Sequence, residues 1–395
     1  MSQVSPPAWL DKNFLETALA GSVDSFEVRT MGAVGDGYTS ALLRVKVQLK
    51  SGKTENVVVK RLVQTNENSK FITETTMFDR EILMYKETLP QLQKLLEKAF
   101  PGDVQPIAPR HFYSCDGTVV MEDLSASGFT MPDRREGMDL EHTLLLMRTA
   151  ARFHAASVVL YQQVDPESMA LYSKSIFSEA PINNMRKFFT GMTLLLADEV
   201  KKWPEYGEEY SKKLRAMAPK MLDLCIAGSK RDEKRFNVLT HDDLWINNIM
   251  LRGSTDIRFI DFQMPHFASP GNELHLILMS SLEDEVRRKH KDVLMKEYHT
   301  SLCDTLTVLG HKNLCITLEE LKEEYAKSSL YGLVLAVVYL PAMLCSPGYD
   351  VPMFDSDCSL DNSIYDDSKF EEVMREILRE YEQLGAFELA EKYIS

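Results

Sequence analysis

The chain has 395 residues, 44% of them hydrophobic, and a formal net charge of −14 at neutral pH. This length suggests two or three domain-sized units with a substantial core. The acidic net charge argues against nucleic acid or an anionic membrane as the main partner, because both are negatively charged and bind surfaces rich in lysine and arginine. Six scattered cysteines without a C-x-x-C pair indicate reduced thiols, and the N-terminus has no signal-peptide pattern, so we expect a cytoplasmic protein.

The N-terminal region predicts a mixed unit of strands and helix. Strand-like patterns occur at 26–29, 41–49 and 56–62. The glycine-rich turn Gly35-Asp36-Gly37 lies between the first two. Such a turn can fold over phosphates, because glycines let backbone N–H groups approach closely. The glycine spacing differs from that of protein kinases, and plain hairpins contain similar turns, so both interpretations stay open.

A lysine lies near the end of the third strand pattern. Lys60 follows three valines and is typical of the strand lysine that contacts the α- and β-phosphates of ATP. Residues 78–85 have apolar residues at helical spacing, and a helix glutamate would pair with this lysine. The pattern alone leaves Glu74, Glu81 and Glu87 open, since a helix offers several acids per turn. A solvent-exposed lysine and an exposed glutamate are the alternatives.

Another strand pattern covers residues 118–124 and ends in an acidic turn. In a two-lobed kinase, such a strand leads into the hinge, whose backbone binds adenine. An edge strand that ends in a polar loop is the alternative.

Helical patterns dominate the rest of the chain. Two examples are 144–156 and 370–384. His154, within the first of these, is expected to be a packed helix histidine. The almost entirely apolar stretch 330–345 is shorter than the ~20 residues that span a bilayer and contains Pro341, so we expect a core helix there.

The most informative stretch is residues 241–248, which reads H-x-D-x-x-x-x-N and precedes a D-F-x pattern at Asp261. Phosphoryl transfer from ATP needs a carboxylate beside the attacking hydroxyl and oxygen ligands that hold Mg²⁺ against the phosphates. Asp243, Asn248 and Asp261 supply these groups at kinase spacing. A lone aspartate is more often a solvated loop residue, but an ordered set of matching positions favours a kinase-type site.

Two strand-like runs, 249–251 and 257–260, separate the two halves of this pattern. The residues between them form a good hairpin connection. Because a hairpin brings its ends together, Asn248 and Asp261 are expected to lie close enough to share a metal ion.

The sequence resembles the ecdysteroid kinase-like family, also described as choline-kinase-like, within the aminoglycoside phosphotransferase and choline kinase group. The segments that carry the resemblance are 35–38, 59–60, 78–85, 89–90, 121–124, 151–157, 241–248, 259–263 and 269–270. It implies an α+β, two-lobed, protein-kinase-like fold. The smaller, sheet-rich lobe would cover residues 1–121, and the larger, mainly helical lobe residues 122–395.

The resemblance also implies roles for the residues of the loop. Asp243 would be the catalytic base, and His241 would brace the loop. Asn248 and Asp261 would bind Mg²⁺.

The resemblance implies a set of nucleotide-binding residues as well. They are Gly35, Asp36, Gly37, Lys60, Glu81, Glu122 and Leu124. Glu81 would pair with Lys60, which selects it among the three glutamates. The backbone of Glu122 and Leu124 would contact adenine.

Two positions depart from the family pattern. Asp242 stands where relatives often carry glycine. We expect its side chain to point outward, because a second carboxylate beside Asp243 would raise the pKa of one of the two carboxyl groups. Glu273 stands where relatives often carry aspartate, at a position that is expected to buttress the catalytic loop. Neither change removes a reacting group.

The resemblance implies an ATP- and Mg²⁺-dependent kinase that phosphorylates a small-molecule hydroxyl, such as that of an ecdysteroid or a xenobiotic alcohol, with a role in detoxification. A choline or ethanolamine kinase, a catalytically silent binder of a lipophilic ligand and a protein scaffold are the alternatives. Candidates for an apolar pocket are Trp245, Phe188, Phe189, Tyr331, Tyr339 and Met343. Such residues are more often core than pocket, and composition does not separate a sterol pocket from a choline cage. The oligomeric state is left open.

Overall fold

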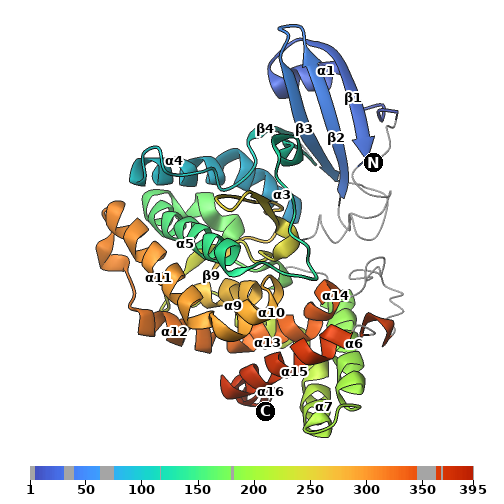
Figure 1. Cartoon of the computed structure of the whole chain (residues 1–395), viewed down its shortest axis with the longest axis vertical. Helices are drawn as coiled ribbons and strands as arrows, with labels where there is room; N and C mark the ends of the chain where they lie inside the picture. The colour runs from blue at the N-terminus through green and yellow to red at the C-terminus, as the bar shows by residue number, and fades with distance from the viewer. Residues whose placement is uncertain are drawn as a thin grey trace.

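The computed structural model describes residues 5–30, 40–62, 75–115, 117–178, 182–344, 362–365 and 368–394. A smaller body built on one sheet stands on a larger body of helices (Figure 1). The predicted α+β, two-lobed, protein-kinase-like fold is confirmed. The division between residues 121 and 122 stays a prediction. The turn with Gly35, Asp36 and Gly37 lies outside the described residues.

Five antiparallel strands form the sheet of the smaller body. They are β1 (Val23–Thr30), β2 (Ser40–Leu49), β3 (Thr54–Leu62), β4 (His111–Cys115) and β5 (Thr118–Glu122), in the order β1-β2-β3-β5-β4. Side chains alternate between the two faces, so the paired Val45 and Val57 pack on the face that helix α1 (Lys12–Leu19) covers. Lys60, paired with Leu42 and Val119, projects from the other face toward the helical body.

A helical segment anchors the sheet to the larger body. It consists of α3 (Met77–Leu83), the π-helical turn η1 (Met84–Thr88) and α4 (Leu89–Ala99). The predicted helix at 78–85 is thus present and continues further. Arg80 of α3 is fully buried and donates to the carbonyls of Lys174 at 2.8 Å and Pro265 at 3.2 Å. These bonds fix α3 to the helical body.

The larger body is mostly helical. Its helices are α5 (Leu140–Gln163), α6 (Ile182–Val200), α7 (Gly207–Met217), α8 (Met221–Ser229), α9 (Pro270–Ser280), α10 (Asp284–Lys289), α11 (Lys291–Val308), α12 (Leu318–Lys327), α13 (Ser329–Val338), α14 (Leu340–Leu344), α15 (Ser368–Gln383) and α16 (Ala386–Ile394). Short 3₁₀ segments are η2 (Leu124–Ser127), η3 (Pro166–Tyr172), η4 (Ile176–Ser178), η5 (Ala218–Lys220), η6 (Ile246–Asn248), η7 (Lys312–Leu314) and η8 (Asn362–Tyr365).

Helix α13 lies at the centre of this body, and all of its residues are buried except Leu330, which is partly buried. The core helix predicted for 330–345 is therefore present, but it is divided at Tyr339 into α13 and α14, and Cys345 lies outside the described residues. A Cβ atom at Gly332 would lie 2.5 Å from the hydroxyl of Tyr381 on α15, so only glycine allows this packing. In the described part of the chain, no helix has the length and apolarity needed to cross a membrane.

Two short ladders carry the motifs of the larger body. Strand β6 (Val238–Thr240) pairs with β9 (His266–Ala268), and β7 (Ile249–Arg252) pairs with β8 (Asp256–Phe259). The predicted hairpin is therefore confirmed. The Ile260 N–H donates to the Asn248 carbonyl at 3.0 Å, which extends the hairpin by one pair. Asn248 therefore lies beside the residue that precedes Asp261.

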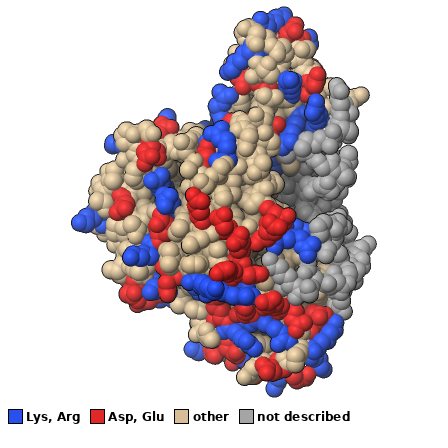
Figure 2. Space-filling model, in the orientation of Figure 1, with Lys and Arg blue, Asp and Glu red and all other residues tan. Residues whose placement is uncertain are grey.

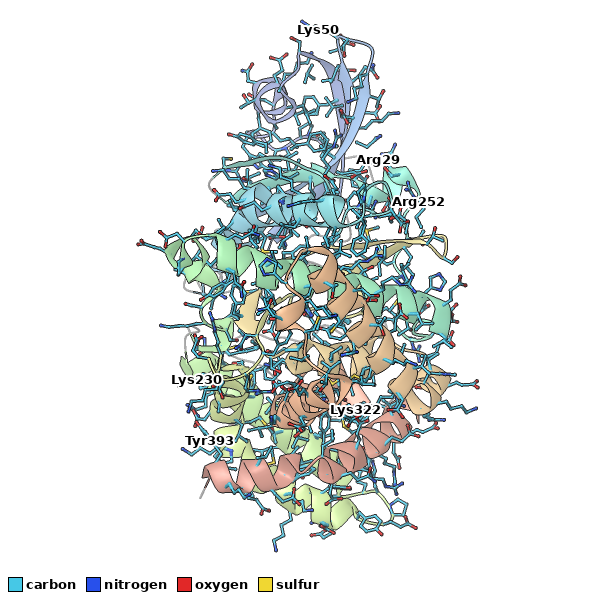
Figure 3. The ribbon with its side chains drawn as sticks, turned by 90° about the vertical axis from the view of Figure 1, so that its left-hand side faces the viewer. Arg29, Lys50, Lys230, Arg252, Lys322 and Tyr393 are labelled. Carbon is cyan, nitrogen blue, oxygen red and sulfur yellow. The ribbon has the colours of Figure 1, made fainter. Side chains whose placement is uncertain are left out.

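The surface charges are mixed rather than of one sign. Acidic side chains gather near the middle of the visible face of the helical body, and acidic and basic rows alternate below them (Figure 2). One ion-pair group on the surface joins Arg288 of α10 to Glu372 and Glu376 of α15. A second view shows Lys50 at the outer end of the sheet, and Arg29 near the junction of the two bodies (Figure 3).

Candidate active site

A buried lysine connects the sheet to the helical body. Lys60, 5% exposed, donates to Glu81 of α3 at 2.9 Å and to Asp261 Oδ1 at 2.7 Å. Burial lowers the pKa of Lys60, but the charges of Asp261 and Glu81 outweigh this effect and raise the pKa overall. The ammonium group therefore stays charged at neutral pH. Glu87 is exposed, and Glu74 lies outside the described residues.

The predicted catalytic loop, residues 241–248, lies between β6 and β7, and its histidine, His241, is buried. The imidazole Nε2 of His241 donates to the Ile260 carbonyl at 2.9 Å, and its ring packs on Phe262 with a centroid distance of 4.5 Å. Burial lowers the pKa of His241, so the imidazole is neutral at pH 7. His241 is thus placed to connect the loop to the segment that carries Asp261.

Asp243 and Asn248 contact each other within the loop. The Asn248 Nδ2 donates to the backbone carbonyl of Asp243 at 2.8 Å and to its Oδ2 at 2.7 Å. Because the amide donates through nitrogen, its oxygen is the atom that can bind a cation. Burial raises the pKa of Asp243 well above its usual range, and the nearby charge of Asp261 raises it further.

The donor set around Asp261 suits Mg²⁺. Asp261 adopts a positive φ of 65°, a conformation that is uncommon for a residue with a side chain and that recurs at functional sites. Its Oδ1 accepts from Lys60, and its side chain is 37% exposed. Mg²⁺ is usually held by one or two protein oxygens together with substrate phosphates, so Asn248 and Asp261 suffice. Among the described residues, no cluster of three or more His, Cys, Asp or Glu side chains could hold a metal alone.

The segment after β5 presents one acceptor and one donor. The Glu122 N–H donates to the Arg110 carbonyl at 2.9 Å, so Glu122 can offer a ligand only its own carbonyl from the backbone. Leu124 begins η2, and an N–H at a helix start has no partner within the helix. An acceptor and a donor two residues apart can pair with the edge of a purine base.

A cavity of about 320 Å³ adjoins this segment. It is on the same face of the sheet as Lys60, because Asn56, which lines it, is four residues earlier on β3. Arg44 of β2 lines the cavity and donates to Ser125 Oγ at 2.6 Å. Its guanidinium group also lies 3.3 Å from Asp123 Oδ2. The cavity is thus lined by β1, β2, β3 and the segment after β5.

The prediction that Asp242 points outward is wrong. Its side chain is buried, and both carboxylate oxygens accept from the Tyr331 hydroxyl, at 3.0 and 3.1 Å. His266 Nδ1 lies 3.3 Å from Oδ2. Repulsion between neighbouring carboxylates favours an outward side chain, but these partners, from α13 and β9, stabilise the carboxylate in its buried position.

Glu273 contacts the loop as the sequence predicts. Its carboxylate accepts from the backbone N–H groups of His241 and Asp242, both at 2.9 Å. His154 is packed as expected, but it also bonds Glu273 at 2.8 Å and the Tyr298 hydroxyl at 2.7 Å. The sequence offered no signal for this role of His154, because the two residues are 119 positions apart.

Gln263 also supports the site, although the sequence pattern assigned it no role. Gln263 Nε2 donates to Glu81 Oε2 at 3.3 Å and so supports the glutamate that holds Lys60. Its place two residues after Asp261 was the available signal. The carboxylate of Glu81 is thereby held from both sides.

Replacing Glu273 by glutamine should destabilise the protein in a pH-dependent way. Burial raises the pKa of Glu273, but hydrogen bonds and charge, first those of His154, outweigh this and lower it overall. A lowered pKa adds stability above the unfolded-state value near 4.3, and that stability is lost as pH falls through the folded-state value. We expect Glu273→Gln to cost about 1.5–3 kcal/mol at pH 7 and less at pH 4, measured by urea unfolding.

The exposed Glu372→Gln variant is the control for this experiment, since surface ion pairs contribute little. An equal loss for Glu273→Gln at both pH values would contradict the assignment.

Most of the aromatic residues considered for an acceptor pocket lie in the core. Phe188, Phe189 and Tyr331 are at most 4% exposed. Tyr339 packs against the first two, with centroid distances of 6.5 and 5.9 Å. Only Tyr339 and Trp245 of the set are partly exposed, since Met343 is also buried. Most of the residues that composition suggested as the lining of an acceptor pocket therefore pack in the core instead.

Comparison with known proteins gives remote structural likenesses. A choline kinase from Streptococcus pneumoniae is 11% identical, with 92% of this chain and 97% of that chain covered and a TM-score of 0.43. An ethanolamine kinase from Plasmodium vivax is 15% identical, with 91% and 82% covered and a TM-score of 0.40. A spectinomycin phosphotransferase in complex with ADP and spectinomycin is 10% identical, with 93% and 97% covered and a TM-score of 0.42.

A comparison with curated proteins found no match. The sequence profile of the ecdysteroid kinase-like family matches residues 34–311, which is more than half of the chain. This segment contains Lys60, Glu81, the catalytic loop and Asp261. The chain belongs to the ecdysteroid kinase-like family.

Proposed function

We propose that this protein transfers a phosphoryl group from ATP to a hydroxyl of a small molecule. The observation that carries the proposal is the convergence of Lys60, Asp243, Asn248 and Asp261 at the junction of the two bodies. These residues supply a cation for phosphates, a carboxylate for the attacking hydroxyl and two oxygens for a metal ion. Membership of a kinase-like family supports the same activity.

Each of the site residues has one role in the proposed phosphoryl transfer. Lys60, held by Glu81, binds the α- and β-phosphates, while the Glu122 carbonyl and the Leu124 N–H bind adenine beside the cavity. Asp243 accepts the proton of the acceptor hydroxyl. Mg²⁺, held by the Asn248 amide oxygen and Asp261, would neutralise charge on the phosphates when bound with the nucleotide.

Asp243 is suited to this task by its surroundings. A carboxylate that is partly withdrawn from water, with a raised pKa, is a better proton acceptor than a solvated one. The Asn248 amide orients the carboxylate, because it bonds both the backbone and the side chain of Asp243. Positioning of this kind supplies much of the catalysis in phosphoryl transfer.

For the acceptor, we propose a lipophilic alcohol such as an ecdysteroid or a xenobiotic. Recognition of choline requires aromatic faces around its ammonium group. The rings of Phe177, Phe188 and Phe189 pack on one another and are at most 4% exposed, so they are not free to surround a cation. The same packing removes these rings from a sterol pocket, so the proposed acceptor class rests on the family rather than on these rings.

The first test is Mg²⁺-dependent ATP consumption by the purified protein with a panel of ecdysteroids, plant-derived alcohols, choline and ethanolamine. We expect turnover with a lipophilic alcohol. Turnover with choline or ethanolamine alone would replace the proposed acceptor class but keep the kinase. A protein that Mg²⁺ and ATP do not stabilise in a thermal shift assay would instead be a silent binder or scaffold.

Asp261→Asn separates metal-dependent binding from proton transfer. We expect this variant to lose turnover and most of the gain in ATP affinity that Mg²⁺ provides, because it removes a charged metal ligand. Lys60 keeps Glu81 as a partner, so the metal-independent part of ATP binding should survive. Isothermal titration with ATP, with and without Mg²⁺, measures the difference. A wild-type response to Mg²⁺ in the variant would rule out this role for Asp261.

A further inference from the structure

The residue before the proposed catalytic base has an unusual backbone. Asp242 has a φ of 61°, in the left-handed region that favours glycine. Its side chain is nevertheless fully enclosed, at 4% exposure for the residue. An aspartate in this conformation and this environment needs compensating contacts, because both the backbone and the buried charge are unfavourable alone.

Those contacts come from two elements outside the loop. The Tyr331 hydroxyl of α13 lies 3.0 and 3.1 Å from the two carboxylate oxygens of Asp242. His266 of β9 lies 3.3 Å away through Nδ1, while its Nε2 is 3.1 Å from the Ser229 carbonyl at the end of α8. Since a carbonyl only accepts, Nε2 carries a proton, and when the imidazole is charged its contact with the carboxylate through Nδ1 is an ion pair rather than a hydrogen bond.

The partners of Asp242 are themselves rigidly placed. Tyr331 is completely buried in the central helix α13. A Cβ atom at Gly228 of α8 would lie 2.9 Å from Tyr331 Cβ and 3.1 Å from its Cα, so α8 and α13 are in near-backbone contact there. The backbone of Tyr331, and with it the position of its hydroxyl, is therefore fixed by the close approach of α8 to α13.

We propose that Asp242 is a positioning residue for Asp243. Tyr331 and His266 hold its side chain from one side, and Glu273 holds its backbone N–H from the other. These contacts fix the peptide that determines the direction of the Asp243 side chain. The proposal rests on the function proposed above and adds to it an attachment of the catalytic loop to α13.

A purely structural buried ion pair is the competing explanation, and kinetics separates the two. Small displacements of a reacting group lower the rate of the chemical step without weakening binding elsewhere. Tyr331→Phe removes only the hydroxyl and keeps the packing of the ring. We expect its kcat to fall about 10- to 100-fold with an unchanged KM for ATP, since Lys60 and Glu81 are untouched.

Substitutions of Asp242 itself should lower kcat by graded amounts. Asp242→Asn keeps an oxygen for Tyr331 and tolerates the positive φ, so its kcat should lie between those of wild type and Asp242→Ala. Tyr381→Phe is the matched control, because Tyr381 is also a buried tyrosine whose hydroxyl bonds a buried histidine, His275 at 3.2 Å, away from the loop. This control should keep the wild-type kcat.

Amide hydrogen exchange tests the proposal independently of any acceptor. In Tyr331→Phe and Asp242→Asn, exchange should accelerate in a peptide covering residues 241–248, and in Tyr381→Phe it should not. Unchanged exchange in that peptide, or a wild-type kcat in Tyr331→Phe, would overturn the positioning role. Absence of ATP turnover in the wild-type protein would refute the proposed kinase function instead, while the exchange result would still decide whether Asp242 holds the loop.

Discussion

Replacing Asp243 by asparagine is expected to abolish turnover while leaving ATP binding intact. The amide cannot accept the proton of the acceptor hydroxyl, whereas Lys60 and Glu81 still hold the phosphates. We expect kcat to fall by about 10²–10⁴-fold, the usual contribution of a general base. The thermal shift produced by Mg²⁺ and ATP should match that of the wild type.

The same variant should be at least as stable as the wild type when neither nucleotide nor Mg²⁺ is present. Burial raises the pKa of Asp243, and a carboxyl whose folded-state pKa is raised destabilises the fold once pH exceeds its unfolded-state value near 3.9. Asparagine removes that charge, so the Tm at pH 7 should be equal or higher. A trade of activity for stability of this kind is common at active sites.

The control for Asp243→Asn is Asp232→Asn. Asp232 is an exposed loop residue whose Oδ1 accepts from the Lys234 N–H, a bond that asparagine can also form. This variant should retain both kcat and Tm. Near-normal turnover in Asp243→Asn would refute the assignment of Asp243 as the base.

Replacing Lys60 by methionine is expected to remove both activity and much of the stability. The Glu81 carboxylate is fully buried, and without Lys60 it loses its ammonium partner. Removing one partner of a buried ion pair costs about 3–5 kcal/mol. ATP binding should weaken strongly as well, because the lysine that contacts the α- and β-phosphates is lost. Urea unfolding and ATP titration measure the two effects separately.

A second substitution distinguishes the structural from the functional part of this loss. Lys60→Met combined with Glu81→Gln removes both charges, and glutamine can keep the contact with Gln263. We expect the double variant to recover most of the lost stability but no activity, since replacing a whole buried pair is often nearly neutral. Lys50→Met, at the outer end of the sheet (Figure 3), controls for the loss of a lysine. A double variant as unstable as Lys60→Met would show that the pair is not coupled.

The proposed reacting groups can be identified in the sequence because their spacing depends on local structure. The hairpin between Asn248 and Asp261 follows from two short strand patterns and a turn, and its register brings those residues together. Alternation along β3 similarly places Lys60 opposite to the valines that pack under α1. The central helix could be predicted because an apolar stretch that is too short to span a membrane is expected to be buried in the protein core.

Only the tertiary structure decided which side chains support those groups. Lys60 and Asp261 are 201 positions apart, and the pairing of Lys60 with Glu81, which the residue pattern without the family resemblance left open, depends on which face of α3 meets β3. The direction of Asp242 likewise depends on Tyr331, 89 residues later.

Local patterns determine secondary structure and the identity of the reacting groups, because those depend on neighbours in the chain. Burial and pairing of charges are determined by packing between distant elements, so the sequence predicted the proposed base, Asp243, and the support by Glu273, but not the contacts of Asp242 with Tyr331 and His266.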